Sequence, residues 1–414
     1  MTSKVSSALL QKGLPMVTNV TENMYAPAGK WILGTAASVV GMIHVGGVTR
    51  LTQSGLSMTT WHPLGSLPPL NQQEWEAEFD RYKQFPEWQQ RQNMTLSEFK
   101  FIFGWEYGHR MLGRTVGLIF VLPWMYFTAR GRIPKGYQGR MVGLLAMGGT
   151  QGLVGWWMVK SGLGDDRRDD KYQIRVKAER LATHLTMAVA TYGALLKTGF
   201  DILGLQHKNI PEEVSKLSKE SLRQASRLRS GSLLLTGLTG VTIVSGALVA
   251  GNDAGRAYNT FPKMADEWIP SSIMDHEPWY RNLTDNTATV QFNHRVLGMS
   301  TAALGVGLVA AGLSPNKAAL ISPQARKGLI AVGASVTGQV TLGITTLLHY
   351  VPITLAAAHQ LGSIVVFTSG IYLAHSLRYA RPAIIRASRN VVTKKSTVNA
   401  PSSSIEGAAK PTVA

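Results

Sequence analysis

The sequence predicts an all-α integral membrane protein with eight transmembrane helices, arranged as two tandem four-helix bundles related by an internal repeat. Of its 414 residues only 16% are charged, whereas a soluble protein has about 25%. Long segments contain no Asp, Glu, Lys or Arg, and about 20 apolar residues are enough to cross a bilayer. These charge-free windows are 31–49, 141–159, 230–252, 296–316 and 328–377.

The windows and the charge clusters between them place the helices in order. The first begins after Lys30 and ends before Arg50, and the second and third are separated by a basic loop at 129–140. Pro352 divides the last charge-free window into two helices, because proline interrupts a helix. None of the runs alternates with period two, so strands are not expected. The expected spans are 31–49, 107–128, 141–159, 181–203, 231–251, 292–312, 328–348 and 353–377.

The positive charge lies in short loops between the spans. The net charge is +18, yet this distribution argues against nucleic acid as a partner and instead sets orientation in the membrane. The loops at 129–140, 205–230 and 313–327 are basic, whereas acidic residues outnumber basic ones in 52–104 and 252–290. The positive-inside rule therefore places both termini on the matrix or cytoplasmic side.

The same pattern gives a domain organisation. We expect an N-terminal tail or weak transit segment in 1–30 and a first bundle in 31–204. A basic linker in 205–230 leads to a second bundle in 231–378, and a disordered basic tail occupies 379–414.

The first long loop contains one further helical pattern. Trp75, Phe79, Tyr82 and Phe85 recur at helical spacing among acidic residues. Two interpretations stay open: a helix that lies on the membrane surface or caps the bundle, and a helix that buries its own aromatic stripe.

An internal repeat relates the two halves of the chain. EYGHRMLG at 106–113 corresponds to QFNHRVLG at 291–298, and LATHL at 181–185 corresponds to AAAHQ at 356–360. Gln151 with Gly155 likewise corresponds to Gln339 with Gly343. Because four helices separate the copies, the two bundles should have the same orientation in the membrane.

Histidine is the residue that can carry metal chemistry here, since the chain has 10 His and no Cys. The absence of cysteine excludes disulfides, thiolate metal sites and covalent c-type haem attachment. In each half, two histidines lie toward the outer ends of different helices, as in bis-histidine haem sites of helical bundles. Simple hydrogen bonding, another metal site and proton relay remain alternatives. The four candidate iron ligands are His109, His184, His294 and His359.

The two copies differ at one chemically important position. Glu106 lies one turn before His109, whereas Gln291 holds the corresponding position before His294. A carboxylate near iron can transfer protons and an amide cannot, so we expect the first bundle to be the reactive one. The alternative role for Glu106 is an ion pair with Arg110. Arg110 and Arg295 are candidate partners of haem propionates or, alternatively, interface anchors.

Several motifs together resemble the haem A synthase family, in its mitochondrial and alphaproteobacterial branch. The resemblance covers residues 30–378, and the cysteine pair that many bacterial members carry in the first outer loop is absent here. It rests on GGVTRLTQSGLSM (46–58), MTLSEFKFIFGWEYGHRMLGRTVG (94–117), QGLVGWWMVKSGL (151–163), GNDAGRAYNTFPKM (251–264), QFNHRVLG (291–298) and LAAAHQLGS (355–363).

The resemblance implies a haem-dependent oxidoreductase of the monooxygenase type. Its substrate would be haem O, whose methyl group at ring position 8 is converted to the formyl group of haem A by successive hydroxylations, for use by cytochrome c oxidase. It implies that His109 and His184 hold the substrate haem and that Glu106 is essential. His294 and His359 would then hold haem b as a cofactor.

The resemblance also implies a location and partners. These are the mitochondrial inner membrane with its lipid, haem O synthase as the source of substrate, and a ferredoxin-type electron donor on the matrix side. A homo-oligomer is compatible with the sequence. The alternative function, a di-haem b-type electron-transfer protein, would need the four histidines but no asymmetric carboxylate.

Overall fold

The computed structural model describes residues 24–164, 174–205 and 210–386, and every regular element in them is a helix. Of the predicted tails 1–30 and 379–414, residues 1–23 and 387–414 lie outside the described residues, whereas 26–30 and 380–386 are helical and not part of a disordered tail. The long helices are α2 (Ala26–Leu51), α4 (Leu96–Ala129), α5 (Gln138–Leu163), α6 (Ala178–Gly204), α8 (Lys219–Gly251), α10 (Thr287–Leu313), α12 (Pro323–Leu348) and α13 (Ile353–Ser376). The short helices are α3 (Gln72–Tyr82), η1 (Pro86–Gln90), α7 (Ile210–Ser215), α9 (Ala254–Ala257), η3 (Trp279–Leu283) and α11 (Pro315–Ala318).

Seven of the long helices in the described part of the chain are long and apolar enough to cross a membrane. The exception is α6, which carries Glu179, Arg180, Lys197 and Asp201 within its length. These charges lower its mean hydropathy, although its length of 27 residues exceeds the roughly 20 that a span requires. The structure therefore confirms an all-helical integral membrane protein and supports seven spans by composition.

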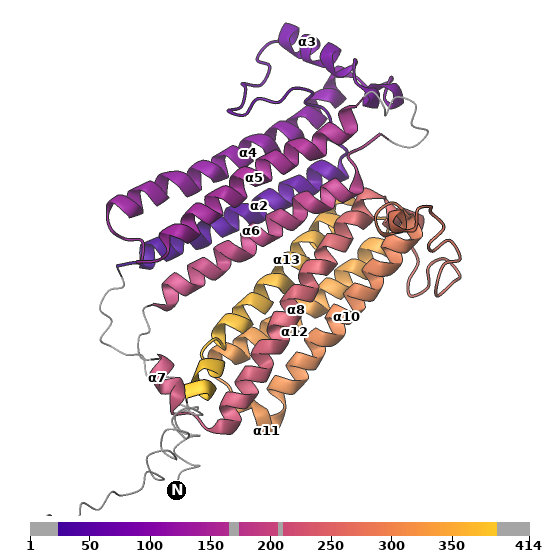
Figure 1. Cartoon of the computed structure of the whole chain (residues 1–414). Helices are drawn as coiled ribbons and strands as arrows, with labels where there is room; N and C mark the ends of the chain where they lie inside the picture. Colours follow the sequence, from indigo (N-terminus) through magenta and orange to yellow (C-terminus); the bar gives the residue numbers. More distant parts are fainter. Residues whose placement is uncertain (1–23, 165–173, 206–209, 387–414) are drawn as a thin grey trace, which may run out of the picture.

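The long helices pack in two groups of four. The first helix group is α2, α4, α5 and α6, and the second helix group is α8, α10, α12 and α13; α6, α8 and α13 bring the two groups together (Figure 1). One apolar cluster includes Ile32, Phe127 and Met141, and a second includes Leu235, Leu329 and Leu373. The first cluster also contains Ile243 of α8 and Ile364 and Phe367 of α13, so the apolar core of the first group continues into the second group.

The aromatic helix in the first long loop caps the outer end of α4. Phe79 and Tyr82 of α3 are buried against Phe99 and Phe103, and the Phe79 and Phe99 ring centroids lie 4.9 Å apart. Of the two interpretations of the pattern, the structure therefore favours a capping helix. Its aromatic stripe is buried on α4 rather than within the loop alone.

Helix α4 begins eleven residues before its expected span because its N-terminus is capped by the chain itself. Thr95 and Glu98 form a reciprocal capping box, which satisfies two backbone N–H groups at the helix start. Glu106 and His109 consequently lie inside a rigid helix and not at its end.

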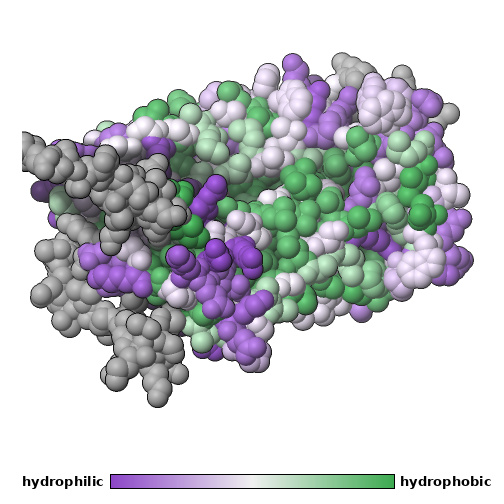
Figure 2. Space-filling view, turned by 60° about the horizontal axis from the view of Figure 1, so that its bottom comes forward, coloured by the Kyte–Doolittle hydropathy of each residue, from purple (hydrophilic) through white to green (hydrophobic). Residues whose placement is uncertain are grey.

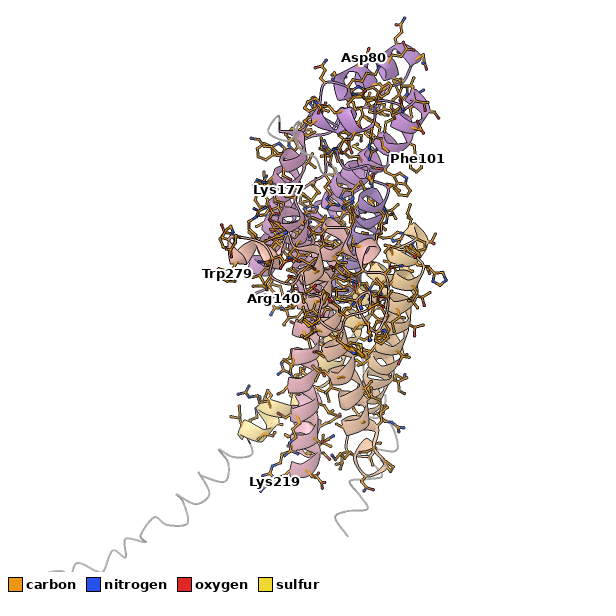
Figure 3. All side chains as sticks on the ribbon, turned by 90° about the vertical axis from the view of Figure 1, so that its right-hand side faces the viewer. Asp80, Phe101, Arg140, Lys177, Lys219 and Trp279 are labelled. Carbon is orange, nitrogen blue, oxygen red and sulfur yellow. The ribbon has the colours of Figure 1, made fainter. Side chains whose placement is uncertain are left out.

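The distribution of polar residues matches a membrane orientation. Figure 2 shows hydrophobic residues across the middle of the visible face and hydrophilic residues toward its ends. Asp80 of α3 and Lys219 of α8 lie at opposite ends of the molecule, and Phe101 and Trp279 lie at its periphery (Figure 3).

The segment GNDAGR at 251–256 forms a turn that joins the two helix groups. Asp253 has φ of 50°, in the left-handed region that Asp tolerates better than most residues. Its carboxylate forms ion pairs with Arg175 and with Arg50, the latter at 3.5 Å. Arg50 also donates to the Ala250 carbonyl at 2.7 Å.

Candidate functional site

The four candidate iron ligands lie in two pairs, one in each helix group. His294 of α10 and His359 of α13 have ring centroids 6.4 Å apart and ring planes 86° apart. His109 of α4 and His184 of α6 lie near each other in the first helix group. All four imidazoles come from helices, so the packing of the helix groups fixes their positions.

The separation of His294 and His359 is that expected of two imidazoles on one iron. An imidazole nitrogen binds a metal ion at about 2 Å, and it lies roughly 1 Å from its ring centre. Two rings on opposite sides of one iron therefore have centroids roughly 6 Å apart, close to the 6.4 Å observed. The pair fits a haem as its two axial ligands.

A hydroxyl group determines which nitrogen of His294 is available to a metal. The Ser245 hydroxyl lies 2.8 Å from His294 Nδ1 and also 2.8 Å from the Thr242 carbonyl. Since a carbonyl can only accept, the Ser245 proton goes to Thr242, and Ser245 must accept a proton from Nδ1. Nε2 of His294 then keeps its lone pair, which is the form that binds iron.

Two glutamines hold the second histidine of each pair. Gln151 of α5 donates to the His184 carbonyl at 3.0 Å, and Gln339 of α12 donates to the His359 carbonyl at 3.0 Å. Gln151 Nε2 also lies 3.2 Å from His184 Nδ1. The repeat pointed to these glutamines but not to their contacts, which depend on the approach of neighbouring helices.

Several buried polar atoms around the two pairs have no hydrogen-bond partner among the described residues. Burying such atoms without a partner is unfavourable, so their concentration here indicates a site that a polar ligand completes. The atoms are His109 Nδ1, His359 Nδ1, Gln151 Oε1, Gln291 Oε1 and Gln339 Oε1. His44 Nδ1 on α2 is also buried and has no hydrogen-bond partner among the described residues.

The helices that flank each pair have stretches without buried residues. On α4 none lies between Glu106 and Phe120, and on α5 none lies between Leu144 and Ser161. In the second helix group the corresponding intervals on α10 and α12 are shorter. The middle stretches of α4 and α5 are thus more exposed than those of α10 and α12, as expected of helices that face lipid.

Glu106 is buried and makes three strong contacts. Oε2 accepts from the Ser57 hydroxyl at 2.7 Å and from the Met58 N–H at 2.9 Å. Oε1 lies 2.6 Å from Arg110, so the ion pair that was the alternative role of Glu106 is present, and its role in the chemistry beside His109 stays a prediction. The side chain is only 3% exposed, and these donors hold its charge in place.

Arg110 and Arg295 fasten the outer loops over the two histidine pairs. Arg110 donates to the carbonyls of Met58 and Thr60 at 3.0 and 2.9 Å. Arg295 donates to the carbonyls of Tyr258 and Thr260 at 3.0 and 2.7 Å, and further to those of Pro262 and Lys263. Their pairing with haem propionates stays a prediction, and their observed contacts are with the loops.

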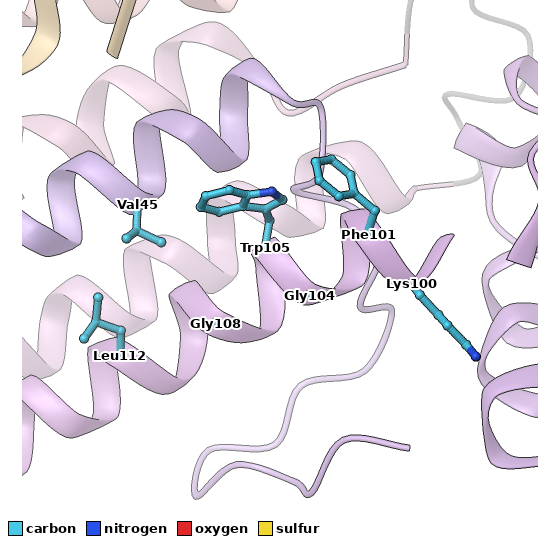
Figure 4. A pocket seen from close by; sticks show the side chains of 7 residues that line it. All are labelled: Val45, Lys100, Phe101, Gly104, Trp105, Gly108 and Leu112. Carbon is cyan, nitrogen blue, oxygen red and sulfur yellow. The ribbon is translucent and has the colours of Figure 1, made fainter. Parts of the chain in front are cut away.

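An apolar groove runs along the outside of the seam between α2 and α4. It has a volume of about 540 Å³, and Val45 and Leu112 approach each other across it while Lys100 points away (Figure 4). Gly104 and Gly108 leave its floor open, and Gly108 is the residue before His109. The groove is lined by Val45, Lys100, Phe101, Gly104, Trp105, Gly108 and Leu112.

One acid in the outer cap has an unusual environment. Burial raises the pKa of Glu87 to about 7, although Arg91 at 3.2 Å and the Tyr82 hydroxyl at 3.1 Å both favour its charged form. Burial and the nearby Glu87 also raise the pKa of Tyr82. Arg91 in turn donates to the Gln53 carbonyl at 3.1 Å, so this cluster ties the cap to the end of α2.

Known proteins are similar to the chain over most of its length. A family described as cytochrome oxidase assembly protein, COX15-CtaA, matches residues 29–371. The haem A synthase COX15 of Arabidopsis thaliana is 42% identical over 91% of this chain and 80% of its own length. The human haem A synthase COX15 is 42% identical over 91% of this chain and 88% of its own length.

A third relative is named as a fusion of two proteins. The haem A synthase-mitochondrial ferredoxin fusion protein of Schizosaccharomyces pombe is 39% identical over 84% of this chain and 59% of the fusion. The family model and the identities agree with the motifs of the sequence. The chain belongs to the haem A synthase family.

Proposed function

We propose that the protein is a haem A synthase that oxidises the C8 methyl group of haem O to a formyl group. The observation that carries this proposal is the asymmetry between two otherwise similar histidine pairs, because only the first has a buried carboxylate one turn away. The corresponding residue of the second pair, Gln291, is buried but cannot ionise. Membership of the haem A synthase family supports the same reaction.

The second pair is proposed to hold haem b as a resident cofactor, with His294 and His359 as axial ligands. The 6.4 Å separation and the Ser245 contact support this assignment. A haem in this position would supply electron transfer. Two imidazoles alone would leave most coordination positions of an iron ion unfilled. The porphyrin ring of a haem fills these positions. No cluster of three or more His, Asp or Glu side chains that could hold a metal ion occurs in the described ranges.

The first pair is proposed to bind haem O as the substrate, between His109 and His184. The chain then has three tasks: to orient the macrocycle, to exclude water, and to hold a proton at the carboxylate of Glu106. Two hydroxylations of the methyl carbon give a geminal diol that loses water to form the aldehyde. Each hydroxylation consumes O₂, two electrons and two protons, places one oxygen atom on the methyl carbon and releases the other as water.

The groove on α4 is proposed to take the hydrophobic tail of haem O. Its floor includes Gly108, next to His109, and it opens toward the lipid. A tail that leaves the site here stays in an apolar environment, which favours a substrate that arrives from the bilayer.

The membrane topology follows from the same assignments. We propose that α6 is the eighth span, since it carries His184 between spans α5 and α8. The two helix groups are then two tandem bundles related by the repeat, in the domains 31–204 and 231–378. The basic loops support our proposal that both termini lie in the mitochondrial matrix. The protein is then a multi-pass protein of the mitochondrial inner membrane, as its mitochondrial relatives suggest.

A ferredoxin-type protein is proposed as the electron donor. The relative in which a haem A synthase is fused to a mitochondrial ferredoxin supports this partner. Haem O synthase, as the source of the substrate, is a further expected partner.

Extraction of non-covalently bound porphyrins from the detergent-purified protein, with identification by mass, tests the function. We expect haem B together with haem O, a hydroxylated derivative or haem A. If only haem B is found when haem O is supplied in the cell, the protein is better described as a di-haem electron carrier. Absence of any haem from intact protein would contradict both functions.

A further inference from the structure

The imidazole ring of each candidate iron ligand packs against a glycine of a neighbouring helix. A methyl group added at that glycine would lie closer to the imidazole than non-bonded atoms normally approach, and in every case the nearest ring atom is Cε1. The distances from the added carbon to Cε1 are 2.9 Å for Gly46 and His109, 3.0 Å for Gly155 and His184, 3.1 Å for Gly246 and His294, and 2.8 Å for Gly343 and His359.

This arrangement is specific to these four glycines. Among the other glycines of these four helices, some meet atoms that do not belong to an imidazole, such as Gly29, Gly47 and Gly231, and others have no atom within 4 Å of an added methyl group. Glycine is unfavourable within a helix by roughly 1 kcal/mol relative to alanine in ordinary positions. The open glycines that lie nearest in sequence to the four contacting ones are Gly41 on α2, Gly152 on α5, Gly237 on α8 and Gly338 on α12.

We propose that Gly46, Gly155, Gly246 and Gly343 are positioning residues that set where the axial imidazole nitrogens meet iron. Cε1 is the carbon between the two ring nitrogens, so a shift of Cε1 away from the helix moves Nδ1 and Nε2 together. The helix backbone supplies a wall that, unlike a side chain, cannot rotate away. This proposal rests on the proposed bis-histidine haem sites.

The polar contacts complete the positioning. Gln151 and Gln339 hold the backbone of His184 and His359 from the helices that also supply Gly155 and Gly343. Ser245, next to Gly246, holds His294 Nδ1. Gly155, Gly246 and Gly343 each restrain a ring edge that these hydrogen bonds leave free, and Gly46 restrains the ring of His109. Metal sites commonly depend on such outer contacts to orient their ligands.

The second haem site gives the sharper experiment. We expect Gly246→Ala and Gly343→Ala to change the low-spin bis-imidazole signal of haem b in electron paramagnetic resonance, or to lower the haem b content of the purified protein at least threefold. The matched variants Gly237→Ala and Gly338→Ala should keep the wild-type signal and content. A Gly246→Ala protein with both unchanged would overturn the proposal.

The first site provides an internal check against general misfolding. Gly46→Ala and Gly155→Ala should weaken haem O binding at least tenfold in a spectral titration while the haem b signal stays that of the wild type. Gly41→Ala and Gly152→Ala are their controls. Loss of both haems in every positioning variant but not in the controls would assign the glycines to helix packing and contradict the proposal. Wild-type protein without a bis-imidazole signal would instead overturn the proposed haem sites.

Discussion

Glu106 and Arg110, one turn apart on α4, form a buried ion pair in which Arg110 Nη2 lies 2.6 Å from Glu106 Oε1. The same arginine holds the carbonyls of Met58 and Thr60, and the other oxygen of Glu106 accepts from Ser57 and Met58. The carboxylate is therefore tied both to its helix and to the loop above it. A proton gained or lost at Glu106 acts on a fixed geometry, which is what general acid or base catalysis requires.

Glu106→Gln is expected to lower haem A formation by about 100-fold or more. The amide has nearly the same shape as the carboxylate that it replaces, but it cannot transfer a proton. Binding of haem O should persist, since both histidines remain. The measurement is the ratio of haem A to haem O extracted from cells that express the variant. Glu98→Gln, at the capping box of the same helix, is the control and should leave this ratio unchanged. Normal haem A production by Glu106→Gln would refute the role of the carboxylate.

Ser245→Ala is expected to weaken haem b binding by about 10-fold to 100-fold, the usual effect of removing an outer contact of a metal ligand. Without an acceptor for Nδ1–H, His294 becomes a poorer electron donor to iron, so the midpoint potential of haem b should rise. A spectroelectrochemical titration measures the potential. Ser232→Ala on the same helix, whose hydroxyl donates to the Leu228 carbonyl at 2.6 Å, should not change it. An unaltered potential in Ser245→Ala would exclude the assigned tautomer of His294.

The stability of the outer cap is expected to fall as the pH rises from about 4.5 to about 7. Burial raises the pKa of Glu87 from its ordinary value of 4.5 to about 7, so the folded protein retains a proton that the unfolded chain has lost. Stability decreases with pH wherever the folded state binds more protons, and the effect is complete above the folded pKa. Thermal unfolding in detergent at pH 5 and pH 7.5 measures this loss.

Glu87→Gln should remove that part of the pH dependence, because an amide stays neutral over the whole interval. Glu76→Gln, on the exposed side of α3, should retain the wild-type dependence. Equal pH dependence in the wild type and Glu87→Gln would show that another group is responsible.

Filling the groove on α4 is expected to discriminate between haems. A β-carbon added at Gly108 has no atom within 4 Å. The leucine side chain of a Gly108→Leu variant should therefore occupy the groove without disturbing the helix. Affinity for haem O should fall about tenfold, the equivalent of roughly 60 Å² of lost apolar contact. Affinity for haem B, which lacks the tail, should not change. Gly117→Leu, also in open space on α4, is the control, and equal losses for both haems would place the tail elsewhere.

The sequence was sufficient to predict an all-helical membrane protein and its family, because both depend on local information. Charge-free windows report the length of a span directly, and motifs such as EYGHRMLG are contiguous. The sequence also led us to Gln151 and Gln339 through the repeat. Their contacts with the His184 and His359 carbonyls could not be predicted, since these depend on how α5 meets α6 and α12 meets α13.

Three features escaped sequence reasoning for similar reasons. The early start of α4 depends on a capping box between Thr95 and Glu98, which a hydropathy window does not detect. The contact of Ser245 with His294 joins residues far apart in the chain. The loop contacts of Arg295 are with backbone carbonyls, which carry no residue-specific signal. The roles of the four histidines and of Glu106 stay predictions.

Gly46 and Gly47, neighbours on α2, face the two histidine pairs in different ways. Gly46 lies under His109, while Gly47 receives the side chain of Gln360, the residue after His359, whose amide donates to the Ile43 carbonyl at 3.1 Å. A methyl group on Gly47 would overlap Gln360 Oε1. One turn of α2 thus contacts both helix groups, through His109 in the first and Gln360 in the second. In the proposed two-haem arrangement, this turn of α2 would set the distance that electrons cross between the two sites, whichever haem occupies them.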